Sequence, residues 1–181
     1  MAQTSNRTKL VALMGSAAAA TALLTGIADH EGKKNVGYYD IARIPTACYG
    51  DTKDVQVGKF YSDAECQVRL ERQALVHAEG VVQCVPGLKG RGGIIRAAGS
   101  TAYNIGVGGF CGSTAASRFK AGDWIGGCLA LGPYFVVVRK DGSSVVTSGF
   151  INARIKGKLQ AVQGLINRRV WEMDQCIRGI G

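Results

Sequence analysis

Residue types that build metal and nucleotide sites are scarce or poorly placed in this chain. It has only two histidines, and none of its six cysteines lies in a C-x-x-C pair, so a zinc site is not expected. The Gly-rich stretch GVGG at 106–109 lacks a following Lys-Ser/Thr, which excludes a phosphate-binding loop there. No zinc-finger or RNA-binding signature is present, and the basic residues are scattered. We therefore expect no metal ion, no cofactor and no nucleic-acid partner.

Acidic residues are also outnumbered, with 13 Asp and Glu against 22 Lys and Arg, for a net charge of +9. Such a balance favours an anionic partner, and a lipid surface or an acidic cell-wall polymer fits better than nucleic acid. The length of 181 residues suits one domain, or one domain in two lobes preceded by a leader. Hydrophobic residues make up 46% of the chain, which is enough for a substantial core.

Charge is absent from residues 10–28, LVALMGSAAAATALLTGIA. As one helix this segment would span about 28 Å, close to the roughly 30 Å hydrocarbon layer of a bilayer. Only seven of its nineteen residues are strongly apolar, and the others are Ala, Gly, Ser or Thr. Because small residues contribute little to insertion, its preference for the membrane amounts to only a few kcal/mol.

Three interpretations of this leader remain open. A cleaved signal peptide fits Arg7 and Lys9, the apolar run, and the small residues Ala18 and Ala20. A permanent anchor fits the length but not the weak apolarity, whereas a temporary anchor that later leaves the bilayer fits both. All three interpretations place residues 29–181 outside the cytoplasm.

Cysteine is missing from residues 1–47, and all six cysteines follow the apolar run. An even count in an exported chain predicts up to three disulfides. The sequence leaves all fifteen pairings open. The cysteines are Cys48, Cys66, Cys84, Cys111, Cys128 and Cys176.

The middle of the chain predicts a small β-region followed by a long helix. Residues 36–61 alternate short apolar and aromatic pieces with Gly, Pro and Asp, as hairpins do. Ser62-Asp63-Ala64-Glu65 is a capping box that starts a helix from Asp63 to about Cys84. Pro86-Gly87 ends this helix, which would be roughly 30 Å long and join two lobes.

Helices and one hairpin are expected beyond it. We predict a helix over Gly92–Tyr103, a turn at 106–109, helix starts at Ser113-Thr114 and Asp123, a hairpin over 134–148, and a final helix over about Leu165–Ile177. On that final helix the apolar residues Leu165, Ile166, Met173 and Ile177 are expected to face the core.

The stretch HEGKKNVGYYDIARIPTACYG at 30–50 holds the candidate chemistry, namely Glu31, Asp40 and Thr46. Two carboxylates in different environments can act as acid and base, as glycoside hydrolysis requires. Glu31 would end the helix begun by the apolar run, where the negative end of the helix dipole disfavours a carboxylate charge. Asp40, in a polar hairpin, would stay ionised, and Thr46 could hold a water beside it.

This Glu-x8-Asp-x5-Thr pattern, with EG at its start and YG after the Thr, resembles the phage-type lysozymes of glycoside hydrolase family 24. Four further motifs match in order: SDAEC, AYNIGVGGFCGST at 102–114, FKAGD at 119–123 and GLINRRVWEMDQC at 164–176. The weak leader resembles that of signal-anchor-release endolysins of lambdoid phages. The resemblance covers about residues 10–132 and 160–178, while residues 133–160 fit the family poorly.

The resemblance implies an α+β, lysozyme-like fold, with a small β-containing lobe and a larger helical lobe joined by the long helix. By position, Glu31 matches the general acid, and Asp40 and Thr46 match the residues that place the attacking water of an inverting enzyme. Arg168 matches an arginine that pairs with the catalytic Glu, although a surface cation is an alternative. Asn104 matches a position lining the cleft, although it could equally be a structural cap.

The resemblance also implies an endolysin that hydrolyses the β-1,4 bond between N-acetylmuramic acid and N-acetylglucosamine in peptidoglycan. Residues 1–28 would be a releasable signal-anchor and residues 29–181 the catalytic domain. The expected location is the periplasmic side of the host inner membrane and then the periplasm, and the expected form is a monomer. Two alternatives are a lytic transglycosylase, which needs no water-placing partner, and a catalytically dead wall-binding protein. Asp40 and Thr46 argue against both.

Overall fold

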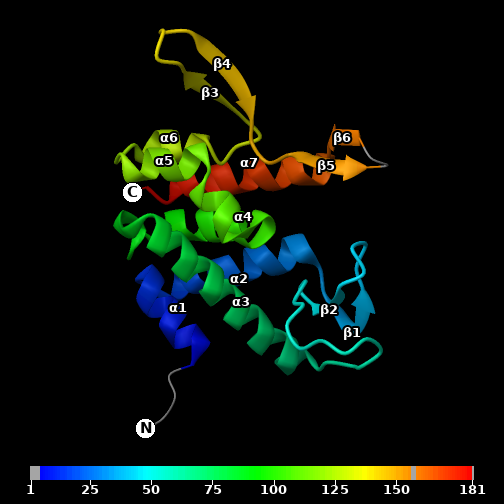
Figure 1. The fold of residues 1–181 in the computed structure, drawn as a ribbon. Coiled ribbons are helices and arrows are strands. Elements are labelled where there is room, and N and C mark those ends of the chain that lie inside the picture. Colours follow the sequence, from blue (N-terminus) through cyan, green and yellow to red (C-terminus); the bar gives the residue numbers. More distant parts are fainter. Residues whose placement is uncertain (1–4, 156–157, 181) are drawn as a thin grey trace.

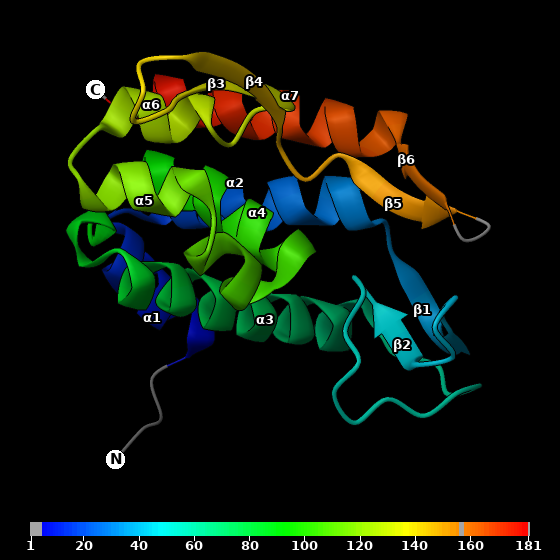
Figure 2. The same ribbon diagram turned by 45° about the horizontal axis from the view of Figure 1, so that its top comes forward.

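A computed structural model describes residues 5–155 and 158–180. The elements are α1 (Asn6–Met14), α2 (Ala17–Glu31), β1 (Lys34–Tyr39), β2 (Pro45–Cys48), α3 (Asp63–Cys84), a 3-10 turn (Pro86–Leu88), α4 (Gly92–Cys111), α5 (Thr114–Lys120), α6 (Trp124–Leu129), β3 (Tyr134–Val138), β4 (Ser144–Ser148), β5 (Asn152–Ile155), β6 (Lys158–Ala161) and α7 (Gln163–Arg178). Most helices form one large lobe, β1 and β2 form a smaller lobe, and α3 runs between the two (Figures 1 and 2). The predicted α+β architecture, with a small β-containing lobe and a larger helical lobe joined by the long helix, is confirmed (Figure 1).

Helix α3 begins and ends where its sequence signals lie. The Ser62 side chain accepts from the Glu65 backbone N–H, and the Glu65 side chain accepts from the Ser62 N–H, so the predicted capping box is present. Its predicted apolar face is buried in the core, and consists of Leu70, Ala74, Ala78 and Val81. The helix therefore anchors the large lobe and carries the small lobe at its N-terminal end.

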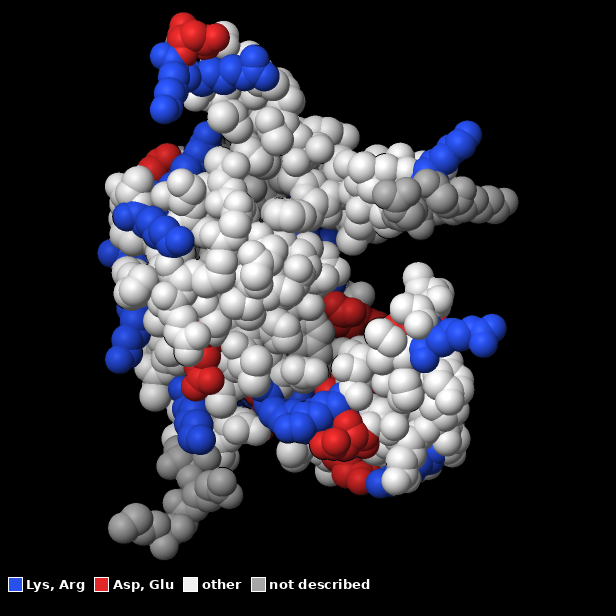
Figure 3. All heavy atoms as spheres, in the orientation of Figure 1, with Lys and Arg blue, Asp and Glu red and all other residues white. Residues whose placement is uncertain are grey.

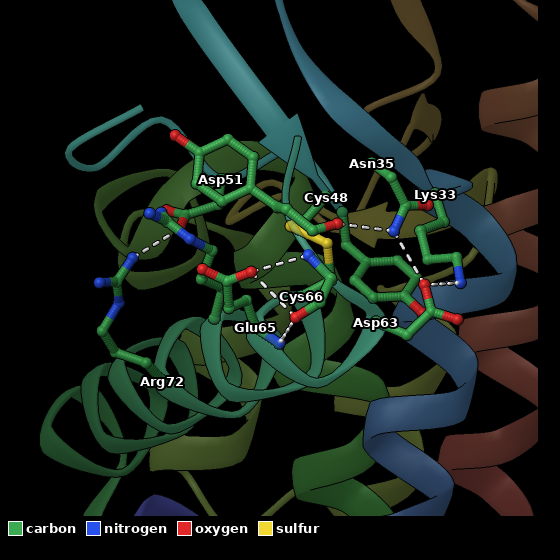
Figure 4. The surroundings of a disulfide bond; sticks show 12 residues. Lys33, Asn35, Cys48, Asp51, Asp63, Glu65, Cys66 and Arg72 are labelled. Carbon is green, nitrogen blue, oxygen red and sulfur yellow. Dashed lines mark hydrogen bonds and ion pairs between the residues drawn. A yellow bond between two sulfur atoms is a disulfide. The ribbon is translucent and has the colours of Figure 1, made fainter. Parts of the chain in front are cut away.

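The small lobe is a hairpin fastened to α3. Strands β1 and β2 are antiparallel, with Tyr38 opposite Thr46 and Tyr39 opposite Pro45. The lobe is tied to the helix by a disulfide from Cys48 in β2 to Cys66, and Figure 4 shows the polar contacts around that bond.

Asp51 adds a buried polar link between the small lobe and α3. It is 1% exposed, and its Oδ2 accepts from Arg69 and Arg72, at 2.6 Å in each case. Its Oδ1 accepts from Gln73 at 2.8 Å. The hairpin thus has a fixed position relative to the long helix, which matters because it carries two of the predicted site residues.

Three disulfides are present, and sequence alone had left their pairing open. Cys48 pairs with Cys66, Cys84 pairs with Cys111, and Cys128 pairs with Cys176. The second joins the C-terminal ends of α3 and α4, and the third joins α6 to α7. The expectation of up to three disulfides is therefore confirmed.

The apolar leader is bent in the folded protein. It does not form the single helix considered above for a segment that spans a bilayer. Helices α1 and α2 meet at 113°, with Gly15 in the left-handed region at φ 84° and Ser16 capping the N-terminus of α2. Their apolar residues lie in the main core, and include Leu10, Met14, Leu23, Leu24 and Ile27. Within residues 5–155 and 158–180, no single helix has the length and apolarity to cross a bilayer, and α1 and α2 meet that test only as a bent pair, by length and composition.

The second lobe departs from expectation at two places. The predicted turn at 106–109 is a kink confined to Gly106, at φ 80° and ψ 154°, where two helical segments of α4 meet before the helix ends at Cys111. The β5–β6 hairpin was not predicted. The β3–β4 hairpin over 134–148 is confirmed, and Ser113 and Asp123 cap α5 and α6 as predicted.

Helix α7 forms where predicted, but its buried face is polar. The residues predicted to face the core are only partly buried or, for Ile177, 41% exposed. Arg168, Arg169 and Glu172 are buried in their place, together with Cys176. Charged side chains occupy this face because they pair with one another and with residues of α2 and α4, and these pairs lead to the candidate site.

Candidate active site

Helix α2 ends beside a hollow between the two lobes, and Glu31 is at this end of the helix (Figures 1 and 3). It is the last residue of α2, and Gly32 follows with φ 68°, which turns the chain away from the helix toward β1. The Glu31 side chain is 23% exposed. Figure 3 shows the hollow between the β1–β2 lobe and the part that carries β5 and β6, with acidic atoms where α2 ends. A substrate could therefore reach this carboxylate.

Arg168 holds one oxygen of Glu31. Its Nη1 donates to Glu31 Oε1 at 2.6 Å, and the arginine side chain is only 6% exposed. This confirms the ion pair that the resemblance implied and rules out the alternative of a surface cation.

The other oxygen of Glu31, Oε2, faces Gly50. A Cβ on Gly50 would lie 3.7 Å from it, and Gly50 has φ 81°, where a side chain would be strained. No hydrogen bond from the described residues reaches Oε2. One carboxylate oxygen is therefore fixed, and the other is directed toward the small lobe.

Glu172 lies behind Arg168 and is fully buried. Its Oε1 accepts from Arg168 Nε at 3.2 Å and from Ser100 Oγ at 2.7 Å. Its Oε2 accepts from Thr101 Oγ1 at 2.9 Å. Burial raises the pKa of Glu172, whereas the charges of Arg169 and Arg168 and the two hydroxyl groups act in the opposite direction.

Asn104 belongs to the same network. Its Oδ1 accepts from Arg169 Nη2 at 3.0 Å, and the same nitrogen donates to Glu172 Oε1 at 3.2 Å. Burial lowers the pKa of Arg169, and the neighbouring Glu172 opposes this. Asn104 is thus linked to the Glu31–Arg168 pair through Arg169 and Glu172, within helix α4 rather than at its cap.

Asp40 follows β1 directly and is held by its own turn. Its Oδ1 accepts from the backbone N–H groups of Ala42 and Ile44, both at 2.8 Å. Its Oδ2 accepts no hydrogen bond from the described residues. This carboxylate is therefore oriented by one oxygen and has the other available for a water.

Thr46 lies on β2, where the register places it opposite Tyr38. The Thr46 Oγ1 donates to the Ile44 carbonyl at 2.9 Å, so its lone pairs remain to accept from water. Asp40 and Thr46 both bond to the backbone of Ile44, but no hydrogen bond among the described residues joins either to Glu31.

Tyr103 and His30 are close enough to Glu31 for its charge to act on them. Tyr103 donates from its hydroxyl to the Tyr49 carbonyl at 2.8 Å, and burial, followed by the charges of Glu31 and Asp51, raises the Tyr103 pKa well above its usual range. It therefore remains a neutral donor that links α4 to the small lobe. His30 lies edge-on to Trp171, with ring centroids 4.9 Å apart, and burial, followed by the Arg168 charge, lowers its pKa.

Glu172, Ser100 and Thr101 belong to the site network but were not predicted from the sequence. A signal for Glu172 was available in RRVWE at 168–172, because positions i and i+4 on a helix are neighbours that favour an Arg–Glu pair. Nothing in the sequence pairs Ser100 or Thr101 with α7, which is about seventy residues away. Their contact depends on the packing of α4 against α7.

Known proteins resemble this chain in sequence. The sequence matches the family model described as phage lysozyme over residues 28–172. It is 32% identical over 175 residues to a protein of Bacteriophage PS119 named SAR-endolysin, covering 91% of this chain and 89% of that protein.

Solved structures share the fold. An endolysin from Escherichia coli O157:H7 phage FAHEc1 superposes with a TM-score of 0.68 at 25% identity, covering 88% of this chain and 92% of that one. The active form of the P1 phage endolysin Lyz has the same fold, with a TM-score of 0.71 at 22% identity and coverage of 100% and 98%. The chain therefore belongs to the phage lysozyme family and is a glycoside hydrolase of the lysozyme type.

Proposed function

We propose that Glu31 is the general acid of an inverting muramidase, and that Asp40 and Thr46 place the water that attacks the sugar carbon. The protein is a muramidase endolysin that acts on peptidoglycan, because it belongs to the phage lysozyme family and its relatives are named SAR-endolysins. One observation carries the residue assignment. Glu31 has Oε1 paired with Arg168 and Oε2 directed toward the small lobe, which carries Asp40 and Thr46.

In this mechanism Oε2 of Glu31 carries the proton that passes to the leaving glycosidic oxygen. Asp40 Oδ2 accepts a proton from the water as it attacks from the opposite face of the sugar, and the Thr46 hydroxyl oxygen holds that water by accepting its second proton in a hydrogen bond. Arg168 orients Glu31 and stabilises the negative charge left on it. Asn104 is linked to the site by Arg169, which donates to its Oδ1. We propose that the amide nitrogen of Asn104 faces the glycan.

The test is Glu31→Gln, which keeps the shape of the side chain but removes the titrating proton. Loss of a general acid typically costs a factor of about 10² or more. Asp29→Asn is the matched control, since it removes an exposed carboxylate two residues earlier on the same helix. Clearing of permeabilised cells at the wild-type rate by folded Glu31→Gln protein would refute the assignment.

Product analysis tests the reaction type. Hydrolysis leaves a reducing sugar end, whereas a lytic transglycosylase leaves an anhydro ring. A predominant anhydro product from the wild-type enzyme would refute the roles proposed for Asp40 and Thr46.

We further propose that residues 1–28 anchor the newly made protein in the host inner membrane and that residues 29–181 form the periplasmic catalytic unit. In the folded protein α2 carries Glu31 into the site and buries Leu23 and Ile27 in the core. A leader that spans the bilayer cannot occupy that core, so the anchored form would lack a completed site. Release into the periplasm would produce the active enzyme, acting as a monomer.

A further inference from the structure

We propose that Glu172 is a positioning residue for the reaction, which acts on the general acid through Arg168. The inference rests on the proposed role of Glu31 and assigns a function to a carboxylate that does not touch the hollow. Glu172 is 0% exposed and lies on α7, one turn after Arg168. It reaches the general acid through Arg168, and its other link toward the site runs through Arg169 to Asn104.

The planar guanidinium of Arg168 couples the position of Glu172 to that of Glu31. Arg168 uses all three of its nitrogens: Nε donates to Glu172 Oε1 at 3.2 Å, Nη2 donates to the Ser100 carbonyl at 3.1 Å, and Nη1 donates to Glu31. Because a guanidinium is a rigid planar fork, fixing Nε and Nη2 also fixes the direction of Nη1. The acceptor on Glu172 therefore helps to determine where Glu31 Oε1 lies and where Oε2 points.

Each carboxylate oxygen of Glu172 accepts a hydrogen bond from a different hydroxyl group. Ser100 Oγ donates to Oε1, the oxygen that receives Arg168 Nε, and Thr101 Oγ1 donates to Oε2. The Ser100 residue also accepts from Arg168 through its backbone carbonyl. Helix α4 thus holds both the arginine and the carboxylate that orients it.

Charge balance supports the same role. Arg168 and Arg169 are adjacent in sequence, both are buried, and Glu172 accepts from each. Without this carboxylate, the two buried guanidiniums would repel each other, and Arg168 could relax toward the solvent-facing hollow. Core stability alone does not require an ionic group here, because well-packed apolar residues often replace buried ion pairs without loss of stability.

The test is a double-mutant cycle on the full-length protein with Glu172→Gln and Arg168→Ala, using kcat and KM on purified peptidoglycan. We expect Glu172→Gln to lower kcat by about 10- to 100-fold, as misplacement of a reacting group does, with KM within about twofold. In the Arg168→Ala background the same change should alter kcat by less than about twofold, because the route is already broken. Asp174→Asn, a carboxylate on the same helix that pairs with the exposed Arg178, is the matched control and should keep the wild-type kcat.

Two results would overturn the proposal: a wild-type kcat in folded Glu172→Gln protein, or equal fold losses in both backgrounds, which a purely structural role would give. If circular dichroism shows that Glu172→Gln does not fold, Ser100→Ala replaces it in the cycle. That variant should lower kcat about three- to tenfold, and only when Arg168 is present. An unchanged kcat in Ser100→Ala would also refute the proposal. Full activity in Glu31→Gln would refute the proposed function itself, whereas an inactive Glu31→Gln with an uncoupled Glu172 would refute only this inference.

Discussion

Leucine at exposed positions of the leader should trap the enzyme in the membrane without disturbing its fold. Ala12, Ala18 and Thr25 are exposed in the folded protein, so longer side chains there meet solvent rather than core. Gly15 and Gly26 are poor choices, although leucine there would also raise apolarity. Gly15 has φ 84°, and a Cβ on Gly26 would collide with the Trp171 ring. Substituting either glycine would damage the folded state and confound the result.

The magnitude follows from the insertion scale. A central leucine contributes about −0.5 kcal/mol and alanine or threonine contributes little, so the triple variant gains roughly 1–1.5 kcal/mol of membrane preference. Because about 1.4 kcal/mol is a factor of ten in an equilibrium constant, the ratio of released to anchored protein should fall about tenfold. The free energy of unfolding of purified soluble protein should change by less than about 0.5 kcal/mol, since the positions are exposed.

Fractionation of expressing cells provides the assay. Wild type should occur in membrane and soluble fractions at the same full-length mass, and the leucine variant should stay in the membrane fraction and lyse cells late. Serine at the same three positions is the matched control and should be released sooner. A soluble wild-type form shortened by about twenty residues would favour a cleaved signal peptide and refute the temporary anchor. Wild-type partitioning of the leucine variant would refute the energetic reasoning.

Three other outcomes are expected. Asp51→Asn should lower the free energy of unfolding by about 3–5 kcal/mol in denaturant titration, since it leaves two arginines without their buried partner; the exposed Asp54→Asn should change it little. Alanine at Cys128 and Cys176 should cost about 4 kcal/mol, because that disulfide closes a loop of 48 residues, and denatured wild type should titrate with no free thiol. Burial lowers the pKa of His30, so the unfolded state binds the proton more readily and stability should fall as the pH drops below about 6.5. His30→Gln should reduce that loss between pH 7.5 and 5.5, and an unchanged pH dependence would contradict the assignment.

Local signals predicted the elements whose cause is local. The capping box at Ser62 and the Lys140–Gly142 turn are set by neighbouring residues, and both form where expected. The buried face of α7 could not be predicted, because charged residues enter a core only when partners from distant helices satisfy them. Arg168 finds Glu31 across 137 residues of chain, and neither hydrophobic periodicity nor propensity carries that information.

The bend in the leader is compatible with the two environments proposed for this segment. In lipid the preferred form of residues 10–28 is a continuous helix that satisfies its own backbone groups. In the folded protein the break at Gly15 turns α1 back along α3, and Arg7 then donates to Thr21 at 2.9 Å and pairs with Glu71 at 3.4 Å. A residue without a Cβ reaches both the helical and the left-handed conformation at low cost, so Gly15 permits the change.

The same apolar residues are removed from water in both states. Leu10, Leu23 and Ile27 would contact lipid in the anchored form and are fully buried in the folded core. Their burial therefore contributes to both sides of the proposed equilibrium and largely cancels, which leaves the weakly apolar alanines and threonines and the polar contacts of Arg7 to decide the balance. Glu31 is the last residue of α2, so its position depends on whether the leader lies in the bilayer or in the folded core. Completion of the active site and withdrawal of the leader from the bilayer would thus be one event, and the resting enzyme would need no separate inhibitor.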